Sequence, residues 1–194
     1  MVQSSKEQDT ISLLQKDPWR MACLKAAFAV GVTDWYLAAG FVRNLIWDYL
    51  HSKTVSTPLN DVDFVYFDAD NTSPREEEVI REKLIDLMPD AVWEVRNQAR
   101  MHIRNAHRPY RNSEDAIAHW PELQTCVGAT LNADGKIAIF APYGLDENWN
   151  CSVRPNPQIP YPPELFVRRV NEKNWMQIWP NLIVEDSPQQ MRRG

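Results

Sequence analysis

Two periods in the placement of apolar residues predict the elements of this chain. Apolar residues three or four apart are typical of helices, whereas short runs rich in β-branched and aromatic residues are typical of strands. On this basis we expect helices over residues 7–16, 18–30 and 41–51, from Ser73-Pro74 onward, and over about 163–179. We expect strands over residues 34–39, 62–67, 91–95, 124–131 and 136–141, the last two joined by the turn N-A-D-G at 132–135.

This order of elements, with a hairpin late in the chain, predicts an α+β (mixed α/β) fold in which helices flank a small mixed sheet. The length of 194 residues favours a single domain over 1–194. Within it we expect N-terminal helices at 1–30, a candidate catalytic core at 31–150, and a proline-rich linker with a C-terminal helix at 151–194.

Composition narrows the class of protein. A net charge of -5 argues against a surface that coats nucleic acid. The three cysteines are odd in number and lack CxxC spacing, which favours reduced thiols over disulfides or a zinc site. The N-terminus lacks the layout of a signal peptide, and no apolar run is long enough to span a bilayer. We therefore expect a cytoplasmic protein without a membrane partner.

Two aspartates stand at the start of an otherwise apolar strand, in the run N-D-V-D-F-V-Y-F. Strand side chains alternate between faces, so Asp61 and Asp63 project from the same face and repel each other. A hard cation that prefers oxygen ligands, Mg²⁺ or alternatively Mn²⁺, removes that repulsion. The competing interpretation is that Asp61 caps a turn while Asp63 is a solvated edge residue, since short motifs often match by chance.

The glycine turn upstream favours the metal site. A strand that ends at Gly40 and turns directly into a helix leaves the first amides of that helix free, and these suit a phosphate. Arg43, in the first turn of the helix, can add a bidentate phosphate contact. Together with the two aspartates on the next strand, this combination indicates a site for a metal and a phosphorylated ligand.

These motifs resemble a known family. The run A-A-G-F-V-R-N-L-I-W-D-Y-L, followed by N-D-V-D-F-V-Y-F, resembles the head of the polymerase-beta-like nucleotidyltransferase superfamily, in particular its CCA-adding and poly(A) polymerase branch. The downstream runs S-E-D-A-I-A-H-W-P-E-L-Q-T-C-V-G-A-T and A-P-Y-G-L-D are similar to later motifs of that branch. Over about residues 30–180 the chain also resembles a small bacterial family of uncharacterised nucleotidyltransferase-like proteins, DUF925.

The resemblance implies a nucleotidyltransferase fold and Mg²⁺-dependent transfer of a nucleoside monophosphate from a nucleoside triphosphate to an acceptor hydroxyl. The acceptor, whether a small molecule, a protein or RNA, is not indicated. Asp61 and Asp63 match the metal-binding pair of the family. The nucleotide-binding residues implied are Gly40, Phe41, Arg43, Asn44 and Arg100.

The chain departs from the family pattern at several points. Ala39 stands where the family usually has a first glycine, and Asn44 replaces the aspartate of V-R-D. The altered glycine turn favours the alternative of a catalytically weak or inactive nucleotide-binding or partner-regulating module of the same fold. The chain also leaves no room after residue 180 for a tRNA-binding body, so we do not expect CCA addition.

A third carboxylate, commonly supplied by a later strand in the superfamily, is expected from Glu94 in V-W-E-V. Asp68 is the second choice, because an unbroken strand turns Phe64, Tyr66 and Asp68 to the face opposite Asp61 and Asp63.

An arginine-rich segment over 94–111 forms the other candidate surface. If the segment is helical, one side of it would carry Arg96, Arg100, Arg104 and Arg108. That stripe suits a triphosphate or a nucleic-acid acceptor. The alternative is a solvated helix face whose arginines pair with the acids at 76–78 and 114–115. The resemblance implies further that Asn97, Arg100 and His102 border the catalytic cleft. If residues 96–98 are still extended, Arg96 points away from Asn97. An RNA-binding module built on the stripe is the weakest reading, because the net charge is negative.

Overall fold

The computed structural model describes residues 5–159 and 162–185. The helices in this part are α1 (Ser5–Lys16), α2 (Pro18–Ala29), α3 (Gly40–Leu50), α4 (Pro74–Leu87), α5 (Gln98–Asn105), α6 (Ser113–Ile117), α7 (Asp146–Trp149), α8 (Pro163–Glu172), α9 (Trp175–Ile178) and the 3₁₀ turn η1 (Leu123–Thr125). The strands are β1 (Trp35–Ala38), β2 (Val62–Tyr66), β3 (Trp93–Asn97), β4 (Gly128–Leu131), β5 (Ile137–Phe140), β6 (Ser152–Val153) and β7 (Ile183–Val184).

Five of these strands form one mixed sheet in the order β3-β2-β1-β4-β5. β2 and β3 run parallel, whereas β1 pairs antiparallel with both β2 and β4, and β4 with β5. β6 and β7 form a separate two-stranded sheet. The mixed sheet with flanking helices confirms the predicted α+β fold, and the hairpin between β4 and β5 turns at 132–135 as expected.

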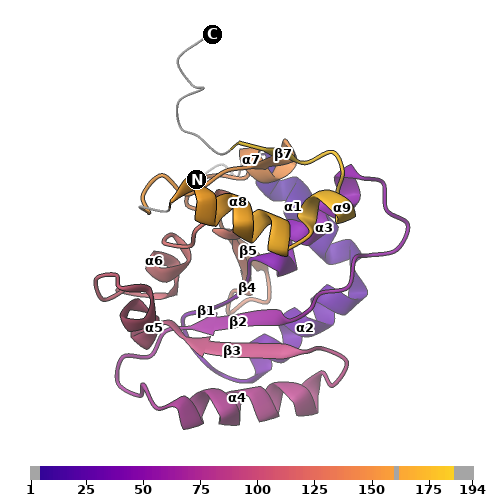
Figure 1. Ribbon diagram of the computed structural model, residues 1–194. Coiled ribbons are helices and arrows are strands. Elements are labelled where there is room, and N and C mark those ends of the chain that lie inside the picture. The colour runs from indigo at the N-terminus through magenta and orange to yellow at the C-terminus, as the bar shows by residue number, and fades with distance from the viewer. Residues whose placement is uncertain (1–4, 160–161, 186–194) are drawn as a thin grey trace.

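Different helices pack against the two faces of the five-stranded sheet. Residues such as Leu37, Phe64 and Val95 pack with the apolar sides of α1 to α4 in the main core. On the opposite face, Val65 packs with Ile117 of α6 in a smaller cluster. Figure 1 shows α4 along one side of β2 and β3, with α8 and α9 across their other side. This second side is the one that Asp61, Asp63 and Glu94 share.

Aromatic packing holds α8 and α9 in place. The ring of Trp47 in α3 makes edge contacts with Trp175 and Trp179, at centroid distances of 5.4 and 5.0 Å. Phe166 and Val170 of α8 belong to the same buried cluster. The indole of Trp179 also donates a hydrogen bond of 2.8 Å to Asp48 of α3. The C-terminal helices are therefore anchored on α3, the helix that begins at the glycine turn.

Some predicted boundaries are wrong. The predicted helix over 163–179 is two helices, because Asn174 between them takes a left-handed conformation with φ of 53°. The predicted strand over 124–131 begins as the turn η1, in which Thr125 donates to the carbonyl of Glu122, and β4 starts only at Gly128. Part of the proline-rich stretch, residues 160–161, lies outside the described residues.

The assignment of residues 1–194 to a single domain stays a prediction. In the part of the chain that the structure describes, no helix has both the length and the apolar character needed to cross a membrane.

Candidate metal and phosphate site

Three carboxylates converge on the face of the sheet that α8 and α9 cross. Each of Asp61, Asp63 and Glu94 offers an oxygen, and these oxygens lie within 4.8 Å of one another. The parallel pairing of β2 and β3 explains this, because Asp63 is directly opposite Glu94, while Asp61 precedes Asp63 by two residues. Asp68, the second choice for the third carboxylate, instead accepts hydrogen bonds from the amides of Asp70 and Asn71 in the loop after β2.

The acidic group is electrostatically strained without a cation. Burial, followed by the neighbouring charges of Asp61 and Glu94, raises the pKa of Asp63 to about 7, against the lowering effect of Arg43 and Lys173. Glu94 accepts an ion pair of 2.9 Å from Arg96. Asp61 and Asp63 form no such pair with any described residue. Their charges are therefore available to a metal ion.

The helix α3 begins beside these acids with free backbone donors. Ala39, which precedes it, has φ of 50° and ψ of -112° and provides no side-chain cap. The carbonyl of Ala39 accepts from the amides of Val42 and Arg43, and no hydrogen bond from the amides of Gly40 and Phe41 occurs in the described part of the chain. A Cβ at Gly40 would lie 3.4 Å from Nη2 of Arg43, so the absence of a side chain there keeps this point open.

Arg43 is a buried cation without a carboxylate partner in the described part of the chain. Its guanidinium lies over the rings of Trp47 and Trp175, at 5.1 and 4.5 Å from their centroids. Its Nε and Nη2 atoms donate to Oδ1 of Asn44 at 3.1 and 2.9 Å. Burial lowers the pKa of Arg43 to about 10, against the raising effect of Glu122 and Asp63, so the group stays charged at neutral pH. A buried cation that pairs with no acid among the described residues favours an anionic ligand.

These groups line one cleft of about 740 Å³, a size typical of small-molecule sites. Its charged lining comprises the acids Asp61, Asp63 and Glu94 and the cations Arg43, Arg96, Arg104, Arg169 and Lys173. Five cations against three acids is a local excess of positive charge in a chain whose net charge is -5. The cleft therefore suits a polyanion that brings a cation with it.

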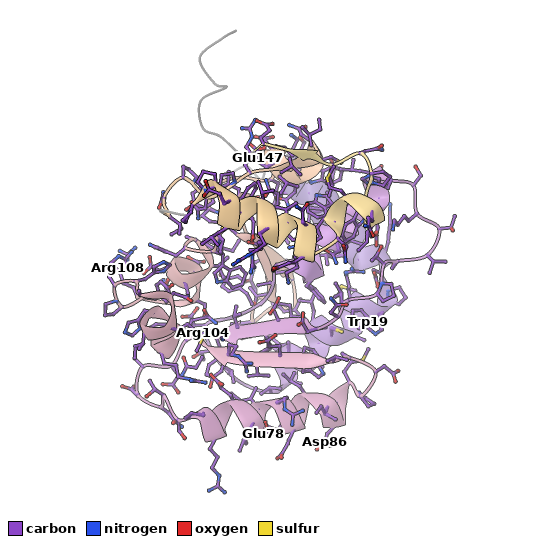
Figure 2. The ribbon with its side chains drawn as sticks, in the orientation of Figure 1. Trp19, Glu78, Asp86, Arg104, Arg108 and Glu147 are labelled. Atoms are coloured by element: carbon purple, nitrogen blue, oxygen red, sulfur yellow. The ribbon has the colours of Figure 1, made fainter. Side chains whose placement is uncertain are left out.

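The segment over 94–111 is not one helix, so the condition for a single arginine stripe is not met. Arg96 lies on β3, helix α5 begins only at Gln98, and Arg108 follows the end of the helix. Arg108 pairs with Asp115 of α6 at 2.8 Å, and Figure 2 shows it farther out than Arg104, which lies near the ends of β2 and β3. Asn97 caps α5 and so excludes Arg96 from the helix, and the arginines of this segment therefore contact different partners.

The remaining predicted site residues lie apart from the cleft. Nε of Arg100 donates to the buried Glu77 of α4 at 3.1 Å, and Arg100 is absent from the cleft lining, as are Asn97 and His102. The side chain of Phe41 packs in the main core, so only its amide can reach a ligand. A nucleotide-binding role for Arg100 stays a prediction, and its contacts favour a structural one.

The structure also adds residues that the sequence did not indicate. Arg169 and Lys173 of the α8 region and Trp175 of α9 line the cleft, and Glu122 lies buried behind it. The only sequence signal for the two cations is their spacing of four, which is equally typical of a solvated helix face.

Acidic residues on adjacent strands of a mixed sheet, beside a helix that begins at a glycine turn, define the class of nucleotidyltransferase folds. A family model described as nucleotidyltransferase matches residues 25–184, and the chain belongs to this family. A solved structure described with the words "the NMR structure of the protein reveals a CCA-adding enzyme head domain" is 35% identical. The match covers 93% of this chain and 96% of that chain, with a TM-score of 0.81. No curated protein matches the chain.

The family model and the solved structure confirm the predicted superfamily and fold. Membership of the smaller bacterial group stays a prediction.

Proposed function

We propose that this protein transfers a nucleoside monophosphate from a nucleoside triphosphate to the hydroxyl of an acceptor, with the help of a divalent metal ion. The observation that carries the proposal is the convergence of Asp61, Asp63 and Glu94 beside the free amides at the start of α3. Membership of a nucleotidyltransferase family supports the same reaction class.

The acidic residues fit a hard cation. Asp61, Asp63 and Glu94 supply only carboxylate oxygens, which are the ligands that Mg²⁺ and Mn²⁺ prefer, and together they would hold the ion. Asp63, whose pKa burial and its acidic neighbours raise, gains most from such a partner. When bound, the ion would neutralise charge on the phosphates and favour the ionised form of the acceptor hydroxyl.

The backbone amides and the remaining side chains of the cleft would bind and orient the substrates. Gly40, with its free amide, and Arg43 line the cleft where the phosphates would lie, the free amide of Phe41 follows in the same turn, and Asn44 fixes the orientation of Arg43. The acceptor oxygen bonds to the α-phosphorus, and the bond from that phosphorus to the bridging oxygen of pyrophosphate breaks. The hydroxyl proton passes to a carboxylate of the site, and pyrophosphate leaves.

The test is transfer of label from an α-phosphate-labelled nucleoside triphosphate to acceptor pools of small metabolites, protein and RNA, in the presence of Mg²⁺. We expect a labelled product from the wild type and none from the Asp61→Asn/Asp63→Asn variant. Asp86→Asn is the matched control, since Asp86 is an exposed acid of α4 outside the cleft lining (Figure 2).

A second outcome would identify a different function. Tight binding of the Mg²⁺–nucleotide complex without any product would indicate a nucleotide-binding or partner-regulating module, which Ala39 in place of the family glycine favours. If neither the metal nor any nucleotide raises the melting temperature, the proposed site is wrong, because a ligand of the folded state must stabilise it.

A further inference from the structure

Helix α8 forms the wall of the cleft that faces the acidic residues, across the sheet from α4 (Figure 1). Phe166 and Val170, four residues apart, bury one side of α8 in the aromatic cluster. Arg169 and Lys173, also four residues apart, lie together on a neighbouring side and line the cleft. The burial of the first pair therefore determines that the second pair faces the candidate site.

Only the Nε atom of the Arg169 guanidinium has a partner among the described residues. Its Nε atom pairs with Oε1 of Glu122, a completely buried acid whose other oxygen accepts from Thr125 at 3.3 Å. The side chain of Arg169 is 38% exposed, and its two Nη groups make no hydrogen bond to any described residue. Glu122 thus fixes the guanidinium and leaves its two amino groups available to an anion in the cleft.

Glu122 also acts on the cation at the opposite wall. It is the strongest of the charges that raise the pKa of Arg43 against burial. One buried acid therefore interacts with two cations, since it raises the pKa of Arg43 on α3 and pairs with Arg169 on α8. Two cationic walls that share a buried counter-charge form a slot for an extended anion.

Lys173 adds a cation that is not committed to any partner. It is exposed at the end of α8 and forms no ion pair in the described part of the chain. It nevertheless lines the same cleft as Asp61, Asp63 and Glu94. Its ammonium is therefore available to an anion that enters this cleft.

We propose that α8 supplies the second half of a polyphosphate site, in which Arg169 and Lys173 bind the outer phosphates of the nucleotide opposite Arg43. The ligand class is a linear polyphosphate, either the tail of a nucleoside triphosphate or the pyrophosphate product. This inference rests on the proposed function, since it assigns residues to the same substrate. It makes the C-terminal helices part of the catalytic unit.

Binding of inorganic phosphate, pyrophosphate and tripolyphosphate with Mg²⁺, measured by titration calorimetry, tests the inference without knowledge of the base or the acceptor. We expect affinity to rise with chain length in the wild type. Lys173→Ala should bind tripolyphosphate about tenfold more weakly, because one charge-assisted contact is lost, and phosphate almost equally. Arg168→Ala is the matched control, since Arg168 is exposed on the same helix and outside the cleft lining.

Arg169→Lys provides a second test. It keeps a positive charge beside the buried Glu122 but lacks the free Nη groups, so we expect the same selective loss for tripolyphosphate. Equal binding by Lys173→Ala and the wild type would overturn the inference, as would an equal loss in Arg168→Ala or a wild type that binds no polyphosphate.

Titration of Mn²⁺ alone separates this inference from the proposed function. Lys173→Ala should bind Mn²⁺ at least as tightly as the wild type, because a cation near the acids is removed, whereas Asp63→Asn should lose the ion. Loss of Mn²⁺ binding in Lys173→Ala would overturn the inference. Absence of Mn²⁺ binding in the wild type would contradict the proposed metal site, while the chain-length comparison would still decide the role of α8.

Discussion

Replacement of Asp63 by asparagine should remove a loss of stability that the wild type undergoes as pH rises from 5 to 8, while it also removes the metal site. Burial and the adjacent acids raise the pKa of Asp63 from 3.8 to about 7 in the folded protein. Between pH 3.8 and about pH 7, the folded state keeps a proton on Asp63 that the unfolded state has lost. Wild-type stability therefore falls as pH rises through this window. Asparagine does not titrate, and Asp63→Asn therefore lacks this contribution.

The size of the effect follows from the width of the window. From pH 5 to a folded-state pKa of about 7 the window spans about two pH units, and each unit corresponds to about 1.4 kcal/mol. The upper limit is therefore roughly 3 kcal/mol. Because Asp61 is partly exposed and water screens part of the repulsion, we expect about half of this, roughly 1.5 kcal/mol.

The assay is urea denaturation of the wild type and Asp63→Asn at pH 5 and pH 8, with a chelator present. At each pH we compare the free energy of unfolding of Asp63→Asn with that of the wild type. This difference should shift in favour of the variant by roughly 1.5 kcal/mol from pH 5 to pH 8. Added Mg²⁺ at pH 8 should stabilise the wild type and leave the variant almost unchanged. A difference that is the same at both pH values, or one that Asp86→Asn reproduces, would refute the reasoning.

Three further predictions concern the same region. Ala39→Gly should raise the free energy of unfolding by about 1 kcal/mol in urea, because glycine adopts the observed φ of 50° without strain. Gly40→Ala should leave the melting temperature unchanged but weaken binding of the Mg²⁺–nucleotide complex at least about tenfold, since its methyl group would lie 3.4 Å from Arg43 in the cleft. Arg100→Ala should lower stability by about 2 kcal/mol, because it leaves the buried Glu77 without this partner, and nucleotide binding measured by calorimetry should not change; weaker binding would instead support the predicted role of Arg100.

Local patterns predicted the half of the site that lies close together in sequence. The glycine turn into a helix and the alternation of Asp61 and Asp63 both depend on the conformation of neighbouring residues, which the sequence indicates directly. The place of Glu94 required one further step, the pairing of β2 with β3, which the family resemblance supplied. The choice of Glu94 over Asp68 rested on strand alternation, and the observed geometry agrees with it.

The other half depends on contacts between distant segments, which leave no local signal. Arg169 and Lys173 have the spacing of a solvated helix face, and only the packing of α8 on Trp47 of α3 turns them toward the acids. The arginines do not form one stripe for a local reason, because Asn97 caps α5 by accepting from the amide of Ala99. Asparagine before a helix is a recognised start signal, and its position would have excluded Arg96 from the helix.

The features that cost stability in this fold gather around one cleft and are complementary to one kind of ligand. Asp61 and Asp63 repel each other and need a cation, whereas Arg43 is buried without a carboxylate partner among the described residues and needs an anion. A metal ion alone would leave the cations without counter-charges, and a polyphosphate alone would approach three acids. A metal–polyphosphate complex satisfies both sets at once, so each component should bind more tightly in the presence of the other. The arrangement therefore favours the complex over either part, as nucleotidyl transfer requires.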